Sequence, residues 1–283
     1  MDLAPEAAAK TLIYASLLLA IGANAARWLL APRLNSQSGD VAADFDHRLV
    51  RLCAAAASVL LVAQLVRALA HTASAFGWSD AFSWSQFSVI ALESRWGEGW
   101  RVQVAASAVL VIATFFIRVN RLAGWTLTSA AVIACAVSMP RLGHAATNNY
   151  GVLLHSAHLL GAGVWLGTLA CILLVRQRAA TDLLRHFAPF ALTGAGIVVV
   201  AGAIAAVEYV GSFSNLWATP YGRTLLLKLT FFAGVVACGF RNWRRWSVVP
   251  SDAVTNRRLE IAESALAFAI VVVTSVLTEL GHP

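Results

Sequence analysis

Eight stretches of this 283-residue chain are apolar over close to the roughly 20 residues that a helix needs to cross the hydrocarbon core of a bilayer. Inside lipid, a segment must satisfy its own backbone hydrogen bonds, which favours helices. Hydrophobic residues make up 59% of the chain and charged residues only 12%, far from the balance of an average soluble domain. We therefore predict an all-α, polytopic membrane protein, a bundle of eight transmembrane helices at residues 11–31, 49–70, 102–118, 123–139, 152–175, 187–210, 222–240 and 259–280.

Basic residues alternate between the connections of these predicted helices. Short loops rich in Lys and Arg stay on the cytoplasmic side of a membrane. The first, third, fifth and seventh connections carry such residues: Arg33, Arg48, Arg51, Arg118, Arg121, Arg176, Arg178, Arg185, Arg241, Arg244, Arg245, Arg257 and Arg258. The pattern predicts both termini on the outer side of the membrane, which in a bacterial inner (plasma) membrane is the periplasmic side. Because the net charge of +7 comes largely from these anchors, it indicates contact with membrane lipid and no nucleic-acid partner.

No Pro-rich or low-complexity linker interrupts the chain, so residues 1–283 are expected to form a single domain. A weak likeness between the segments that precede the third and seventh helices favours two four-helix halves, about 1–140 and 141–283. The connection 71–101 is the longest, and its aromatic residues predict a short segment at the membrane surface, either an interfacial anchor or a lid.

The first apolar run resembles a secretory signal, because Ala23-Asn24-Ala25 matches a small-residue cleavage site. The run continues beyond that site through Leu30, and the N-terminus carries Asp2 and Glu6 instead of a basic cluster. We expect the segment to be retained as the first span.

His155 and His158 lie within the apolar run 152–175. Residues three apart on a helix lie on nearly the same face, with roughly 5 to 6 Å between their Cβ atoms. Ionisable residues inside a membrane are costly and usually functional. The pair is therefore the first candidate for a metal site, in the periplasmic part of the fifth helix. Gly163 and Gly167 follow it in a GxxxG pattern, which predicts close helix packing.

Three further side chains near the predicted periplasmic face complete the list of candidate ligands: His71, His144 and Met139. Neutral imidazole suits copper, zinc, nickel and iron, and a thioether selects Cu(I) among them. A copper site at the outer face of the predicted bundle fits this set of ligands. The oxidation state, Cu(I) or Cu(II), is left open. The chain has only two methionines, so it does not resemble a Met-rich Cu(I) channel.

Other polar residues within the spans are candidates for coupling helices or for a polar path inward. Lys228 is expected to reach outward to Glu208 and form a neutral pair. Gln64 and Arg67 form a polar stripe with His71. This stripe indicates either polar contacts that hold neighbouring helices together or a hydrated path inward. The four cysteines share no CxxC spacing and are interpreted as buried thiols.

Several of these motifs resemble the copper resistance D (CopD) family. They are Gly143-His144-Ala145, the run from Leu154 to Gly167 with its histidine pair, Thr219-Pro220-Tyr221-Gly222-Arg223-Thr224-Leu225-Leu226-Leu227-Lys228, and Arg257-Arg258-Leu259-Glu260. The resemblance spans most of the chain. It implies an inner-membrane copper resistance or copper ion transport protein, with a periplasmic CopC-type copper chaperone as a separate partner.

The hypothesis from these residues is that copper binds His155 and His158, helped by His144, His71 or Met139, and passes inward. Two alternatives stay open: a b-type haem redox protein with histidine axial ligands, and a copper-delivery factor that does not transport. No nucleophile, base and orienting acid gather in one motif, so no enzyme activity is expected.

Overall fold

The computed structural model describes residues 4–34, 39–142, 149–175, 180–248 and 257–281, and this part of the chain is helical without strands. The first span consists of α1 (Ala4–Ala25), a π-helical turn (Ala26–Leu30) and α2 (Ala31–Leu34). The fifth consists of α7 (Asn149–Ala162), a π-helical turn (Gly163–Gly167) and α8 (Thr168–Val175). The other long helices are α3 (Gly39–Phe76), α5 (Arg95–Phe116), α6 (Arg121–Ser138), α9 (Ala180–Val210), α11 (Pro220–Val248) and α12 (Arg257–Leu277).

Seven helices in the described residues are long and apolar enough to cross a membrane, so the chain is a multi-pass membrane protein by length and composition. Their bounds are Ala4–Arg33, Ala42–Phe76, Arg95–Phe116, Arg121–Leu142, Asn149–Val175, Leu183–Val210 and Pro220–Arg244. The eighth predicted span corresponds to α12, whose apolar part, Ile261–Leu277, is shorter than the others. A count of eight spans, and the orientation of the termini, stay predictions.

Most of the helices are longer than the apolar runs that predict them, whereas α12 ends at Leu277, before the end of the predicted run 259–280. The second span was expected at 49–70, whereas α3 covers Gly39–Phe76. Its first turns carry charged residues that pair with each other, as in the contact of 3.0 Å between Arg48 Nε and Asp44 Oδ2. An apolar run indicates only the part of a helix that lies in the hydrocarbon layer. The helix itself can continue beyond that layer into water.

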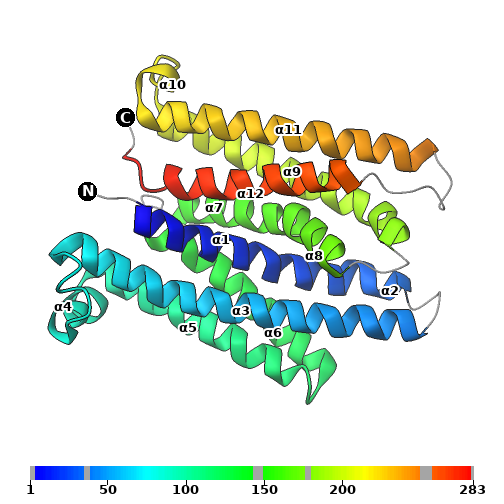
Figure 1. Cartoon of the computed structure of the whole chain (residues 1–283), viewed down its shortest axis with the longest axis horizontal. Helices are drawn as coiled ribbons and strands as arrows, with labels where there is room; N and C mark the ends of the chain where they lie inside the picture. Colours follow the sequence, from blue (N-terminus) through cyan, green and yellow to red (C-terminus); the bar gives the residue numbers. More distant parts are fainter. Residues whose placement is uncertain (1–3, 35–38, 143–148, 176–179, 249–256, 282–283) are drawn as a thin grey trace.

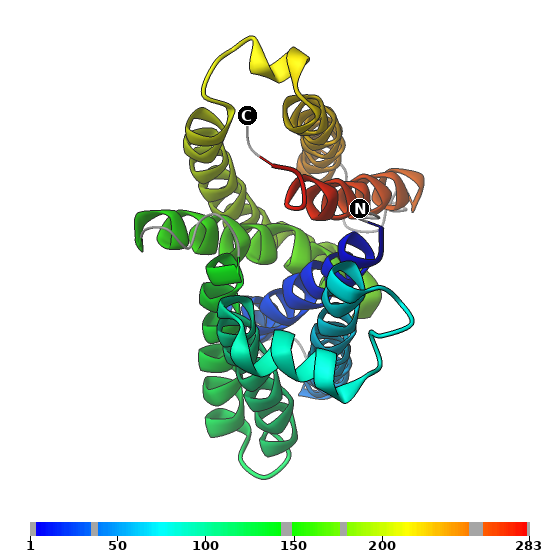
Figure 2. The same cartoon turned by 90° about the vertical axis from the view of Figure 1, so that its left-hand side faces the viewer.

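The long helices run side by side along one axis, with α1 in the middle of the bundle (Figures 1 and 2). α1 contacts α3, α6, α8 and α12. It begins at the same end of the bundle at which α3 and α12 end. We call this the α4 end, after α4 (Trp84–Ser88), and the opposite end the α2 end. The predicted periplasmic side corresponds to the α4 end.

The predicted surface segment in the connection 71–101 is helical. It contains α4 and a π-helical turn (Val89–Glu93), after which Ser94 caps α5 by accepting a hydrogen bond of 2.9 Å from the Gly97 backbone N–H. Trp84 is exposed and Phe87 packs edge-on against Trp100, with ring centroids 6.0 Å apart. This arrangement fits an anchor at the membrane surface. Whether it also acts as a lid stays a prediction.

Glycines bring α1 against the fifth span, as the GxxxG pattern predicts. A Cβ atom on Gly167 would overlap the Leu18 carbonyl oxygen, and one on Gly163 would lie 2.5 Å from Ile21 Cβ. Gly22 on α1 meets Gly167 in the same contact. Glycine lets the two backbones approach closely enough for dispersion contacts to hold them in lipid.

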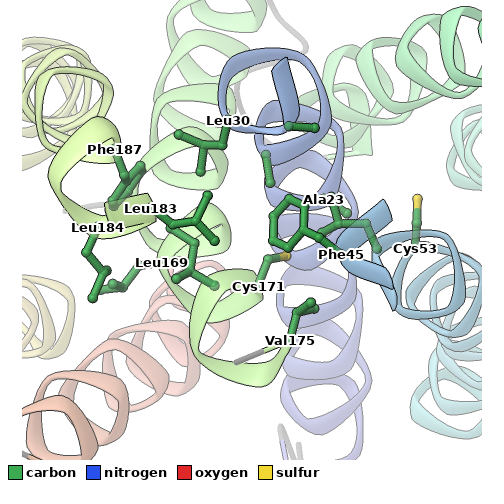
Figure 3. Packing of buried hydrophobic residues seen from close by; sticks show 14 of the residues in the cluster. Ala23, Leu30, Phe45, Cys53, Leu169, Cys171, Val175, Leu183, Leu184 and Phe187 are labelled. Carbon is green, nitrogen blue, oxygen red and sulfur yellow. The ribbon is translucent and has the colours of Figure 1, made fainter. Parts of the chain in front are cut away.

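Buried side chains fill the junction between α1, α3, α8 and α9 toward the α2 end (Figure 3). Phe45, Leu184 and Cys171 are among them, each at most 1% exposed. Three of the four cysteines are buried: Cys53, Cys135 and Cys171. The interpretation as buried thiols is thus confirmed for these three, whereas Cys238 is half-buried.

Candidate metal site

The histidine pair lies on α7 and faces α9. Nε2 of His155 is hydrogen-bonded to the Tyr209 hydroxyl at 2.9 Å, and the two rings stack with centroids 5.5 Å apart. The His158 ring lies against Gly202, where a Cβ atom would be 3.1 Å from His158 Cε1. Gly202 and Tyr209 are seven residues apart and so share one face of α9. The two imidazoles therefore occupy a single α7–α9 interface, as their spacing predicts.

Small residues allow α7 and α9 to come this close. A Cβ atom on Gly161 would lie 3.0 Å from the Gly194 carbonyl oxygen, and one on Gly194 would lie 2.8 Å from the Gly161 carbonyl oxygen. The π-helical turn begins at Gly163, directly after α7. Such turns are rare and occur frequently at functional sites, because they shift the phase of a helix by one residue.

His158 has an unusual environment for a histidine within a span. Its Nδ1 atom is buried and forms no well-aligned hydrogen bond among the described residues, although the Val198 backbone lies within hydrogen-bonding reach of the ring. Lys228 on α11 and His155 lie within electrostatic range of the ring. A buried polar atom without a partner is costly, and such an atom calls for a ligand, a water molecule or a functional explanation.

The expected pairing of Glu208 with Lys228 stays a prediction. Glu208 is exposed, and the described residues contain no ion pair between it and Lys228. Successive residues on a helix point about 100° apart, since there are 3.6 residues per turn. Because Tyr209 points toward α7, its neighbour Glu208 points elsewhere. Lys228 lies near His158.

His71 belongs to a different part of the bundle. Its Nδ1 atom lies 3.1 Å from Oε1 of Glu6 on α1, and its ring stacks on Trp96 of α5 with centroids 4.2 Å apart. Arg67, one turn earlier on α3, lies over the same Trp96 ring at 5.7 Å. These contacts are made with α1 and α5, whereas those of His155 and His158 are made with α9.

The remaining candidate ligands do not complete the site in the part of the chain that the structure describes. Met139 begins a 3-10 turn (Met139–Leu142) that contacts α7, and it packs against the same hydrophobic cluster as Leu159 and Leu160 of α7. His144 lies outside the described residues. Among the residues described, no group of three or more His, Cys, Asp or Glu side chains could hold a metal ion. His155 and His158 are the candidate ligands that the fold brings together.

Two residues of this site were missed by the sequence reasoning, Tyr209 and Gly202. An aromatic residue near the end of a span usually indicates an interfacial anchor. A glycine in a span usually indicates helix packing. Only the rotation of α9 relative to α7 shows that both face the histidines.

The chain was compared with known families and proteins. The family model "Copper resistance protein D-like, N-terminal domain" matches residues 1–155, and the model "Copper resistance protein D" matches residues 181–277. The copper transport protein CutJ of Bacillus subtilis (strain 168) is 27% identical over 228 residues, which are 73% of this chain and 41% of CutJ. The chain thus spans less than half the length of this relative. No solved structure matches the chain.

Proposed function

Because this chain belongs to the copper resistance D family, we propose that it binds copper ions at the α4 end of the bundle and passes them across the membrane. His155 and His158 are the proposed ligands. The membrane is the bacterial inner membrane, the α4 end faces the periplasm, and transport runs inward. The relative CutJ, named as a copper transport protein, supports the choice of copper as the cargo.

One observation carries the assignment of ligands: the Nδ1 atom of His158 is buried and forms no well-aligned hydrogen bond in the described residues, although the Val198 backbone lies within reach of the ring. A neutral imidazole offers one nitrogen lone pair, and copper is among the metals that imidazole suits. The neighbouring His155 is held by Tyr209, which fixes the orientation of its ring. Hydrogen bonds of this kind orient a metal-binding histidine and tune its basicity.

A third ligand completes the site in this proposal, and His144 is the residue we assign to it. It precedes His155 by eleven positions in the sequence. Met139 is the alternative third ligand, since the 3-10 turn that it begins contacts α7. His71 is excluded from this proposal because Glu6 and Trp96 already engage its ring on other helices. A periplasmic CopC-type chaperone is the proposed donor of copper to this site.

The test is the double substitution His155→Ala and His158→Ala in bacteria grown with added copper. We expect cellular copper, measured by mass spectrometry, to fall toward the level of cells that lack the protein. His47→Ala is the matched control, because His47 is exposed on α3. Both variants are compared at equal membrane abundance. Unchanged copper content in the double variant would refute the proposed ligands.

A further inference from the structure

Three polar side chains with unusual environments lie at the junction of α1, α3 and α5. Gln64 on α3 is 0% exposed, and both its Nε2 and its Oε1 lack a hydrogen-bond partner among the described residues. Gln103 on α5 is also 0% exposed: its Nε2 donates hydrogen bonds to the Ser138 and Met139 carbonyl oxygens at the end of α6, whereas its Oε1 lacks a partner among the described residues. Arg67 is 6% exposed and its Nε lacks one. We call these three residues the Gln64 cluster.

Trp96 and Trp100 of α5 join α5 to the part of α3 that carries Gln64 and Arg67. Gln64 and Arg67 are three residues apart and share one face of α3. Trp100 of α5 donates a hydrogen bond of 2.8 Å from Nε1 to the Gln64 carbonyl oxygen, and Gln103 lies three residues after Trp100 on the same face of α5. Trp96 lies below the Arg67 guanidinium and stacks with Trp100 at 6.2 Å.

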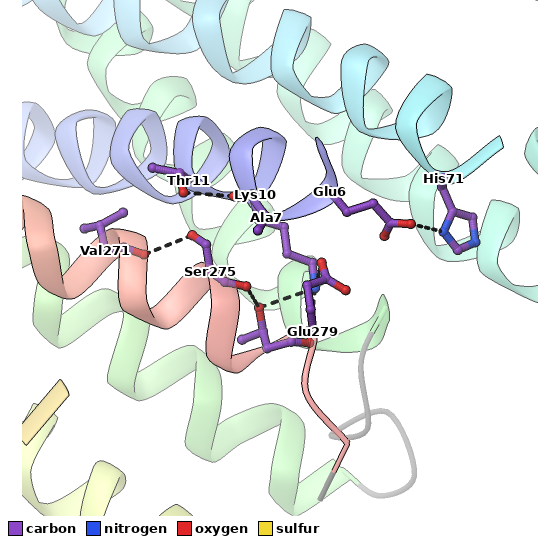
Figure 4. A network of polar contacts seen from close by, with 9 residues as sticks. Glu6, Ala7, Lys10, Thr11, His71, Val271, Ser275 and Glu279 are labelled. Atoms are coloured by element: carbon purple, nitrogen blue, oxygen red, sulfur yellow. Dashed lines mark hydrogen bonds and ion pairs between the residues drawn. The ribbon is translucent and has the colours of Figure 1, made fainter. Parts of the chain in front are cut away.

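Polar contacts cover the cluster at the α4 end. Glu6 on α1 contacts His71, and Lys10 on α1 contacts Glu279 beyond α12 at 2.6 Å (Figure 4). Lys10 Nζ also donates a hydrogen bond of 3.2 Å to the Thr278 carbonyl oxygen. These contacts tie the ends of α1, α3 and α12 together. Glu6 and Glu279 both lie within electrostatic range of Arg67.

Apolar side chains lie beyond the cluster, toward the α2 end. Leu17 of α1, Leu60 of α3 and Leu110 of α5 are each 0% exposed and belong to one hydrophobic cluster. Leu60 is four residues, about one turn, before Gln64 on α3. The polar region is therefore bounded by the contacts of Glu6 and Lys10 on one side and by buried leucines on the other.

We propose that the Gln64 cluster binds internal water molecules at the α1–α3–α5 junction, apart from the histidine site. Its four unpartnered atoms comprise two donors, Gln64 Nε2 and Arg67 Nε, and two acceptors, the Oε1 atoms of Gln64 and Gln103. Buried waters typically make about three hydrogen bonds to such atoms, and they both donate and accept.

The charges nearby favour water over an ion. The two cations Arg67 and Lys10 are matched by the two carboxylates Glu6 and Glu279, so the region needs no further counter-ion. A copper ion would be repelled by the Arg67 guanidinium and would find amide oxygens instead of imidazole nitrogens. The cluster is thus a hydrated region that copper does not enter.

Radiolytic hydroxyl-radical labelling in H₂¹⁸O tests this proposal on the full-length protein in detergent, because bound water generates radicals next to the side chains it touches. Trp100 and Trp165 are the matched probes, since they are 7% and 8% exposed and are of the same residue type. We expect Trp100 to be labelled strongly and Trp165, which packs in the apolar core, to be labelled weakly. Equal, weak labelling of both tryptophans in the unmodified protein would overturn the proposal.

The substitution Gln64→Met provides a second measurement, because it keeps the side-chain volume and removes both amide atoms. We expect labelling at Trp100 to fall to the level of Trp165, and the melting temperature to fall because hydrogen bonds to water are lost. A rise in melting temperature would mean that the amide is buried dry, and would contradict the proposal. Thr128→Val, at a buried position on α6, is the control.

Cellular copper separates this proposal from the proposed function. We expect folded Gln64→Met protein to support the same copper content as the unmodified protein. A loss as large as that in the His155→Ala, His158→Ala double variant would place the cluster on the copper route and overturn its separation from the histidine site. Failure of the histidine test alone would leave the labelling result unaffected.

Discussion

The hydroxyl of Tyr209 on α9 lies 2.9 Å from Nε2 of His155 on α7, and the two rings stack. This contact joins the C-terminal half of α9 to the first half of α7. It leaves His155 with a defined ring orientation next to His158. The proposed copper site therefore depends on α9 as much as on the helix that carries the ligands.

Tyr209→Phe should weaken copper binding, because it keeps the stacked ring and removes only the hydrogen bond to His155. Loss of a hydrogen bond that orients a metal ligand costs roughly 10-fold to 100-fold in metal affinity. Competition with a Cu(I) chelator measures the effect on purified protein. Tyr150→Phe, at an exposed position on α7, should leave the affinity unchanged.

Gly202→Ala should displace the His158 ring, because the new Cβ atom would lie 3.1 Å from Cε1 and 3.4 Å from Nδ1. Copper affinity and cellular copper should both fall. Gly196→Ala is the matched control on the same helix, since no atom lies within 4 Å of a Cβ built there. Equal copper binding by the two variants would argue against a role for the His158 ring.

Gly22→Ala should destabilise the bundle, because a Cβ atom on α1 would overlap the Gly167 backbone. Overpacking of a tight interface typically costs about 1–3 kcal/mol. The melting temperature in detergent should fall clearly below that of the Gly196→Ala protein. A variant as stable as that control would show that α1 and the fifth span can separate without cost.

Lys228→Met should strengthen copper binding, because it removes a positive charge within electrostatic range of His158. Repulsion between two cations grows in a medium of low dielectric constant. Titration with a Cu(I) chelator should show a higher affinity. Arg223→Met, which removes an exposed charge from the same helix, should have little effect. Weaker binding by Lys228→Met would instead indicate that the lysine supports the site.

The purified protein should contain copper after growth with added copper and should lack the Soret absorption of haem. A haem held by two axial histidines needs ligands on facing helices, whereas His155 and His158 share α7. Metal analysis and a visible spectrum of one sample measure both. A Soret band that disappears with His155→Ala would favour the redox protein over the copper protein.

Much of the fold follows from the sequence alone. Apolar runs of bilayer length predict the spans, because lipid requires each crossing segment to satisfy its own backbone. The spacing of His155 and His158 predicts one shared face, and Gly163 and Gly167 predict the close approach that α1 makes. Local geometry determines these features, so no knowledge of the neighbouring helices is needed.

The partners of each polar side chain could be decided only by the tertiary structure. The sequence groups His71 with the other histidines, whereas the fold places His71 against Glu6, and it also places Lys228 near His158. A helix that is apolar on all sides carries no hydrophobic stripe to indicate which face meets which neighbour. That rotation is set by glycine contacts and shape complementarity between helices, which become visible only when the helices are packed together.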